Sequence, residues 1–203
     1  MSINRLAETM TLFAVVCAGV YPILHLGRPW FAYWLFPYPN TMSLWPQWKS
    51  PLLWDFMALF TYAVASVVFR YLGLLPDLAT MRDRAPRPAG KMVYGFFAMG
   101  LRGSGTQWRH LRATYGTLAA IVAPLVVSVH SIVGLDFAGA ATPGWHSTEY
   151  PPIFVFGAPW SGLSMVMLLL LALRAPVGLT PYITERHIGA LAKLMLTSSL
   201  CMT

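Results

Sequence analysis

Four long apolar stretches divide this chain, and each is long enough to cross a lipid bilayer. About 20 apolar residues in a helix span the roughly 30 Å of hydrocarbon in a membrane. The stretches cover residues 6–26, 52–75, 115–137 and 153–173, and a fifth over residues 188–203 stops before it reaches that length. They predict an all-α fold, a polytopic transmembrane helical bundle with four full spans and one partial span. We therefore assign residues 1–203 to a single integral membrane domain, and the short fifth stretch predicts that the chain is a fragment.

The charge content excludes an ordinary soluble domain. Charged residues make up 10% of the chain and hydrophobic residues 57%, against about 25% charged residues in soluble domains. The net charge of +7 is concentrated in particular loops, which indicates membrane orientation and argues against nucleic-acid binding. Cys17 and Cys201 lie in apolar stretches and outside any CxxC or Cys/His spacing, so the sequence predicts no metal site.

The distribution of Lys and Arg predicts which side of the membrane each loop faces. The 76–114 loop carries seven basic residues, whereas the 138–152 loop carries none. Cytoplasmic loops are enriched in Lys and Arg. We therefore expect the N-terminus and the 76–114 loop to be cytoplasmic, and the loops over 27–51 and 138–152 to face outward.

Two short segments are predicted to lie at the membrane surface. The 27–51 loop is rich in Trp, Tyr and Pro, which favours a folded loop at headgroup depth with at most a short helix. It either forms only an aromatic belt, or it also docks a partner protein and covers a ligand pocket. The apolar stretch Lys91–Leu101 is too short to span, so we expect an interfacial helix flanked by basic residues.

Three ionisable residues fall near the outer face. His25 ends the first stretch, Asp55 begins the second, and Asp136 ends the third. A charge near hydrocarbon costs about 2.5–3.5 kcal/mol on insertion scales, and a histidine beside carboxylates is suited to accept protons from a hydroxyl group. Each residue alone could instead be a helix cap or a partner of Arg28, but the three together favour a proton-handling site.

Deeper polar residues leave two interpretations open. His130 lies about 9 Å deeper than Asp136 by helical rise. It either continues a proton path or bonds a carbonyl group left free by Pro124 or a neighbouring helix. Glu8, at the cytoplasmic end, is either an entry point for protons or a solvated residue of the first turn. Hydroxyl groups that could extend such a path, or bond their own backbone, are those of Thr61, Tyr62, Ser66, Ser128 and Ser131.

Several motifs resemble the NrfD/polysulfide-reductase-type membrane subunits. They are HLGRPW (25–30), SPLLWDF (50–56), YLGLLPDLATMRDR (71–84), SVHSIVGLDFA (128–138) and PGWHSTEYPP (143–152). Within that family the chain looks most like the C subunit of alternative complex III, a bacterial quinol-oxidising complex. The resemblance covers essentially the whole chain, although related subunits are longer.

The resemblance implies a quinol, with menaquinol favoured, bound near the outer face without a covalent link. His25, Asp55 and Asp136 match the family's histidine and aspartate positions, and we expect Arg28, Trp30 and Trp54 to shape the pocket mouth. It also implies iron–sulfur and cytochrome c partner subunits at the bacterial inner membrane. The fragment is not expected to be active alone.

Three other functions remain open from the sequence. The chain could anchor a molybdopterin-type reductase, which is the alternative within the family. It could be an assembly subunit without a ligand of its own, in which the acidic residues are structural. It could also be a proton-translocating module that uses Glu8 and His130.

Overall fold

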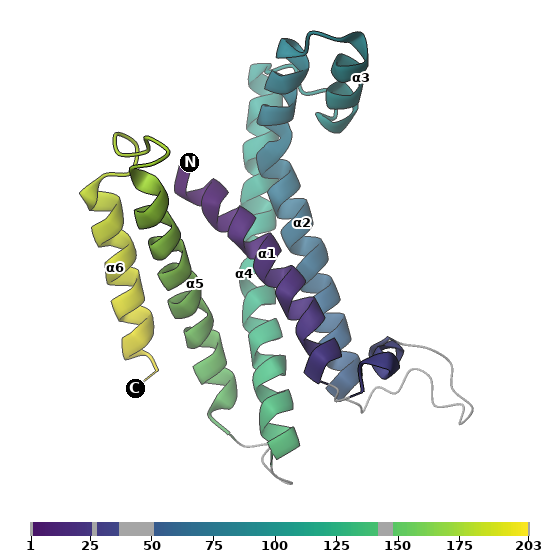
Figure 1. The fold of residues 1–203 in the computed structure, drawn as a ribbon, viewed down its shortest axis with the longest axis vertical. Coiled ribbons are helices and arrows are strands. Elements are labelled where there is room, and N and C mark those ends of the chain that lie inside the picture. Colours follow the sequence, from purple (N-terminus) through teal and green to yellow (C-terminus); the bar gives the residue numbers. More distant parts are fainter. Residues whose placement is uncertain (1, 26–27, 37–50, 142–147, 203) are drawn as a thin grey trace. The chain divides into compact units, whose positions relative to one another are not determined.

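The computed structural model describes residues 2–25, 28–36, 51–141 and 148–202, and these residues form helices and turns without any strand. The elements, in chain order, are α1 (Ser2–His25), the 3-10 helix η1 (Pro29–Leu35), α2 (Pro51–Arg84), α3 (Pro88–Phe97), α4 (Gly105–Ala141), α5 (Tyr150–Arg174) and α6 (Glu185–Leu200) (Figure 1).

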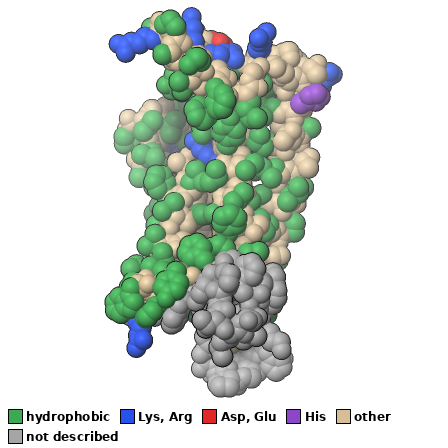
Figure 2. Space-filling view, turned by 90° about the vertical axis from the view of Figure 1, so that its right-hand side faces the viewer, with side chains coloured by type: hydrophobic (Ala, Val, Ile, Leu, Met, Phe, Trp, Pro, Cys, Tyr) green, Lys and Arg blue, Asp and Glu red, His purple; other side chains and the backbone are tan. Residues whose placement is uncertain are grey.

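Four of these helices, α1, α2, α4 and α5, are long and apolar enough to cross a membrane. Helices α2, α4 and α5 contain the predicted spans 52–75, 115–137 and 153–173, and α1 covers residues 6–25 of the first. The prediction of a polytopic helical membrane protein is confirmed. Large apolar side chains such as Phe13, Phe60 and Leu168 are exposed on them, and hydrophobic side chains predominate on the helix surfaces visible in Figure 2. Such surfaces suit lipid contact, where backbone polar groups must be bonded inside helices.

Two helices extend into the predicted 76–114 loop, whose assignment outside the membrane stays a prediction. Helix α2 continues through Pro76 to Arg84, and α4 already begins at Gly105. Hydropathy marks where a helix leaves the hydrocarbon, whereas backbone bonding and capping decide where it ends. Helix α2 ends just before Ala85, which precedes Pro86, and the residue before a proline is disfavoured in helical conformation.

The predicted fifth stretch is helix α6, which starts earlier than its apolar run. The side chains of Thr184 and His187 form a capping box at its beginning, and such a pair satisfies backbone N–H groups of the first turn. Helix α6 packs against α5 (Figure 1), but it is not among the four helices long and apolar enough to span. The partial span therefore stays a prediction.

The chain separates into two compact units. Unit 1 comprises residues 1–63 and 125–203, and unit 2 comprises residues 64–124. The core of unit 1 joins Val166 and Leu170 of α5 to Ile183, with Leu6 and Met10 of α1 packed against them. The core of unit 2 has a separate set of side chains, which are Leu75, Ala79, Ala98 and Leu101.

Candidate functional site

Two aspartates from different helices meet in unit 1. The side chain of Asp55, one turn into α2, lies beside the side chain of Asp136 near the end of α4. Two neighbouring carboxyl groups can hydrogen-bond each other only when one of them carries a proton, because an ionised carboxylate only accepts. Both residues are half-buried, and Asp136 Oδ2 is buried and has no hydrogen-bond partner among the described residues. This oxygen therefore has unused hydrogen-bonding capacity.

Close helix packing fixes the position of Asp136. A Cβ atom on Gly134 would lie 3.0 Å from Pro151 Cα and 3.1 Å from Tyr150 O, so only glycine lets α4 approach the start of α5 this closely. Ala138 is completely buried and Phe137 stacks on Phe154 at 5.5 Å between ring centroids. The carboxyl group therefore lies in a tightly packed segment.

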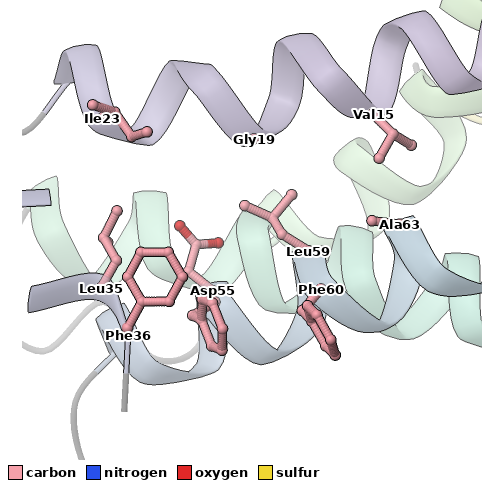
Figure 3. A pocket seen from close by; sticks show the side chains of 10 residues that line it. Val15, Gly19, Ile23, Leu35, Phe36, Asp55, Leu59, Phe60 and Ala63 are labelled. Atoms are coloured by element: carbon pink, nitrogen blue, oxygen red, sulfur yellow. The ribbon is translucent and has the colours of Figure 1, made fainter. Parts of the chain in front are cut away.

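Asp55 also borders a cavity of about 210 Å³ within unit 1. Figure 3 shows its carboxyl group pointing from α2 toward α1, into the space between the two helices. Aromatic rings form one wall, where Phe36 packs on Phe56 at 4.8 Å and Phe56 stacks on Phe60 at 5.9 Å between centroids. The described residues that line it are Val15, Gly19, Ile23, Leu35, Phe36, Asp55, Phe56, Leu59, Phe60 and Ala63.

The cavity suits the ring of a quinol in size and chemistry. Pockets that enclose a drug-sized ligand measure about 300–1,000 Å³, so this cavity is large enough for a small ring system and too small for a complete lipid-tailed quinone. Among the described residues, its walls are apolar except at Asp55. An apolar slot with one placed polar group is typical of a site that orients a mostly apolar ligand.

Comparison with known proteins identifies the family. Residues 1–197 match the family model described as polysulphide reductase, NrfD. The chain belongs to the NrfD family. It is also 25% identical over 166 residues to a protein of Halobacterium salinarum that is named as the membrane subunit of a dimethyl sulfoxide reductase. That match covers 81% of this chain and 34% of the relative, so the chain spans about a third of the relative's length.

The remaining predicted site residues of this NrfD-family chain lie at different distances from the cavity. His25 is the last residue of α1, two positions after the lining residue Ile23, and its side chain lies outside the described residues. Arg28, Trp30 and Trp54 are exposed, and the described lining of the cavity does not include them. Their assignment to a pocket mouth stays a prediction, as does that of His25.

His130 makes a bond that neither of its two interpretations named, and its place in a proton path stays a prediction. Its Nδ1 atom lies 2.8 Å from Val126 O, one turn earlier in α4. This carbonyl group is not the one that Pro124 leaves without an N–H partner, which belongs to Ala120. The ring also meets Tyr62 edge-on at 6.4 Å between centroids. Thr61 and Ser131 likewise donate to carbonyl groups of their own helices, so these contacts support a structural role.

Glu8 lies in α1 and is half-buried, and its proposed role as a proton entry point stays a prediction. The 37–50 part of the aromatic loop and His146 lie outside the described residues. Within the described residues no three His, Cys, Asp or Glu side chains gather as metal ligands would.

Sequence reasoning missed the residues that form most of the cavity wall. Phe56 and Phe60 are four residues apart, the spacing that places side chains on one helix face, and they follow Asp55 directly in the sequence. Gly19 lies across the cavity from them and has no atom within 4 Å of where a Cβ would be. The aromatic spacing was a usable signal, whereas the glycine could be recognised only from the fold.

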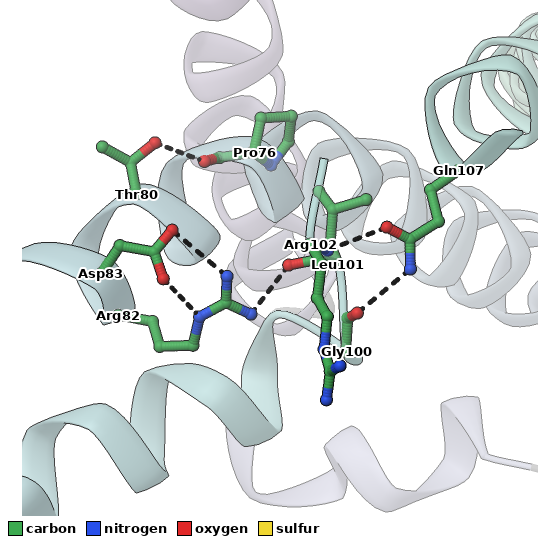
Figure 4. Close-up of polar contacts among 8 residues, drawn as sticks. All are labelled: Pro76, Thr80, Arg82, Asp83, Gly100, Leu101, Arg102 and Gln107. Carbon is green, nitrogen blue, oxygen red and sulfur yellow. Dashed lines mark hydrogen bonds and ion pairs between the residues drawn. The ribbon is translucent and has the colours of Figure 1, made fainter. Parts of the chain in front are cut away.

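A second polar cluster, in unit 2, has a different character (Figure 4). Arg82 bonds the neighbouring Asp83 at 2.9 Å and donates through Nη1 to Leu101 O at 2.7 Å. Gln107 accepts from the backbone of Arg102 at 2.9 Å and donates to Gly100 O at 3.2 Å. These bonds hold the turn after α3, and the cluster is structural.

Proposed function

We propose that this NrfD-family chain forms the quinol-binding part of the membrane subunit of a bacterial respiratory quinol oxidoreductase. The observation that carries the proposal is the Asp55–Asp136 pair, with its buried oxygen that lacks a partner among the described residues, beside an aromatic cavity. Paired acids of this kind are suited to exchange protons with a ligand.

The chemistry follows from what a quinol loses on oxidation. Conversion to the quinone releases two protons and two electrons. His25 would accept one proton, and Asp55 with Asp136 would accept the other and hydrogen-bond the ring hydroxyl. The electrons would reduce an iron–sulfur cluster in a partner subunit, because the sequence carries no CxxC spacing of its own for such a cluster. Menaquinol is the favoured substrate, and cytochrome c subunits of the same complex would receive the electrons next.

The proposed location is the bacterial inner membrane, with the carboxyl pair near the periplasmic face. The basic residues support this orientation, because they cluster between residues 82 and 112, at the other ends of α2 and α4 from Asp55 and Asp136. The positive-inside rule then assigns the N-terminus and residues 76–114 to the cytoplasm. The iron–sulfur partner would dock on the periplasmic side, as in alternative complex III.

A second candidate is the membrane anchor of a molybdopterin-type reductase. The name of the Halobacterium salinarum relative, which refers to a dimethyl sulfoxide reductase, favours it. Both candidates place quinol at the same carboxyl pair and differ in the final electron acceptor. Turnover of the purified complex with dimethyl sulfoxide, compared with turnover with a c-type cytochrome, distinguishes them.

The first experiment is Asp55→Asn in the full-length protein within its complex. We expect assembled complex, shown by co-purification of partners, with quinol oxidation reduced tenfold or more, about 1.4 kcal/mol or more of lost transition-state stabilisation. Asp83→Asn is the matched control, because Asp83 is on the same helix but is exposed and paired with Arg82. Normal turnover of Asp55→Asn would contradict the proposal, and loss of assembly would assign the acid a structural role.

A further inference from the structure

Helix α3 turns its apolar side away from the rest of unit 2. Met92 and Phe96 are 73% and 78% exposed, and Val93 and Phe97 are about half exposed. At 100° per residue these four side chains lie within an arc of about 140° on one face of the helix. None of the residues of α3 is buried. We call these four side chains the α3 apolar face. Among the described residues, Met92 and Phe96 have little cover, and Val93 and Phe97 are about half covered.

Glycines fit α3 against α2 and against the connection between the two helices. Gly95 lies across the helix from Val93 and Phe97, and a Cβ on it would be 3.4 Å from Arg82 Cδ of α2. A Cβ on Gly90 would be 3.4 Å from Ala85 Cβ, in the connection between α2 and α3. Ala98, just after the helix, is buried with Leu75 and Ala79 of α2. The packing therefore fixes which side of α3 points outward.

These contacts also set the depth of α3. Tyr71 of α2 donates from its hydroxyl group to Phe97 O, and the remaining contacts extend to Arg82. The apolar run of α2 ends at about Leu75, and Arg82 and Arg84 follow at the end of the helix. Helix α3 thus lies along the part of α2 that passes from hydrocarbon to the polar boundary, where an amphipathic helix can bury one face.

The charges around α3 are of one sign. The sequence has no Asp or Glu between residues 84 and 135, whereas six Lys and Arg lie between residues 84 and 112. Arg84, Arg87 and Arg112 form no side-chain hydrogen bond or ion pair with another described residue. Figure 2 faces the side of unit 2 on which α3 lies in Figure 1 and shows Lys and Arg gathered with apolar side chains at that end.

We propose that α3 is a membrane-surface helix that inserts Met92, Val93, Phe96 and Phe97 into a bilayer containing anionic lipid, with the surrounding cations on the lipid headgroups. An amphipathic helix with one apolar face and basic residues around it is suited to bind an anionic bilayer surface. The partly exposed Trp108 at the start of α4 adds a side chain that favours the same depth. Basic residues both precede and follow the residues of the α3 apolar face in the sequence. Positive charge spread in this way favours an acidic lipid surface over a protein partner.

The test places a fluorescent probe on the α3 apolar face of the full-length protein. Met92→Cys is labelled after the other cysteines are replaced by Ser, and the protein is reconstituted into nanodiscs of phosphatidylcholine with phosphatidylglycerol. One or the other lipid carries brominated chains, which quench a probe that they touch. Pro86→Cys, at an exposed position between α2 and α3, is the control outside the apolar face.

We expect quenching at position 92 by both lipids, stronger for phosphatidylglycerol, and weak quenching at position 86. Arg87→Gln with Lys91→Gln should lower the preference for the anionic lipid by up to about fivefold for each cation removed. Arg186→Gln with Lys193→Gln, which removes the same charge from α6 of unit 1, should leave that preference unchanged.

Two results would overturn the proposal. An absence of quenching at position 92 in every nanodisc would mean that protein, either another segment or a second copy, covers the α3 apolar face. Equal quenching by the two lipids, unchanged by the Arg87 and Lys91 substitutions, would mean that the helix has no preference for anionic headgroups.

Discussion

Asp83 in unit 2 and Asp136 in unit 1 are both aspartates near the end of a long apolar helix, yet their surroundings differ. Asp83 is 67% exposed and pairs with Arg82 at 2.9 Å. Asp136 pairs with a second acid, and its other oxygen is buried without a partner among the described residues. The two aspartates differ in the charge of their partner more than in their position along the helix. An acid beside an arginine is solvated and structural, whereas an acid beside another acid stays available to a ligand.

The two units also differ in how closely their helices approach around these acids. In unit 1, α4 contacts the start of α5 through Gly134, two residues before Asp136. In unit 2, the same helix passes Gly116 with no atom within 4 Å of where a Cβ would be. Close helix packing therefore accompanies the acid pair and is absent around Gly116. This difference supports a site in unit 1 whose side chains are held in place by packing.

Gly134→Ala tests this difference with the largest expected effect. The added methyl group would overlap the backbone of Pro151, and overpacking of this kind costs about 1–3 kcal/mol. We expect a lower unfolding temperature for the full-length protein in detergent. Gly116→Ala, on the same helix, should be neutral or slightly stabilising, because alanine favours helix by up to about 1 kcal/mol. Equal effects of the two substitutions would show that the packing is not specific to unit 1.

A double-mutant cycle on the carboxyl pair is expected to have the next largest effect. Asp55→Asn and Asp136→Asn should each lower quinol oxidation by about tenfold or more, equivalent to 1.4 kcal/mol or more. Residues that act as one unit are not additive, so the double variant should lose little more activity than either single variant. Additive losses in turnover would mean that the two acids act separately.

Gly19→Leu is expected to have a smaller effect on ligand binding. A leucine at this position would extend into the cavity that Asp55 borders, since nothing else lies within 4 Å of its Cβ. We expect roughly fivefold weaker binding of a quinol analogue, about 1 kcal/mol at the low end of overpacking costs. Gly162→Leu on α5, where the Cβ also meets nothing, is the control. Unchanged affinity for the analogue would mean that the ligand does not occupy this cavity.

The sequence predicted the spans and part of the site for clear physical reasons. Long apolar runs can be stable in lipid only as helices, so the four spans followed from hydropathy alone. The antiparallel order of the spans placed Asp55 and Asp136 on one face of the membrane, and the structure confirms that their side chains meet. Their roles as proton acceptors stay predictions.

Other features depended on information that hydropathy does not carry. The extension of α2 to Arg84 depends on packing of Leu75 and Ala79 against Ala98, which are distant in the sequence. The cavity wall depends on Leu35, the last residue of η1, and on Phe36 directly after it, which packs on Phe56 of α2. Contacts between distant segments determine both features, and a single sequence does not specify them.

The Arg174–Glu185 ion pair gives the smallest predicted effect. Arg174 and Glu185 join the ends of α5 and α6 at 2.6 Å, but Glu185 is 79% exposed. Exposed ion pairs contribute about 0–1 kcal/mol and are screened by salt. We expect Glu185→Gln to lower the unfolding temperature slightly at low salt and not at high salt. A large loss that persists at high salt would show that the buried Arg174 Nε, which lacks a partner among the described residues, depends on Glu185 for its position.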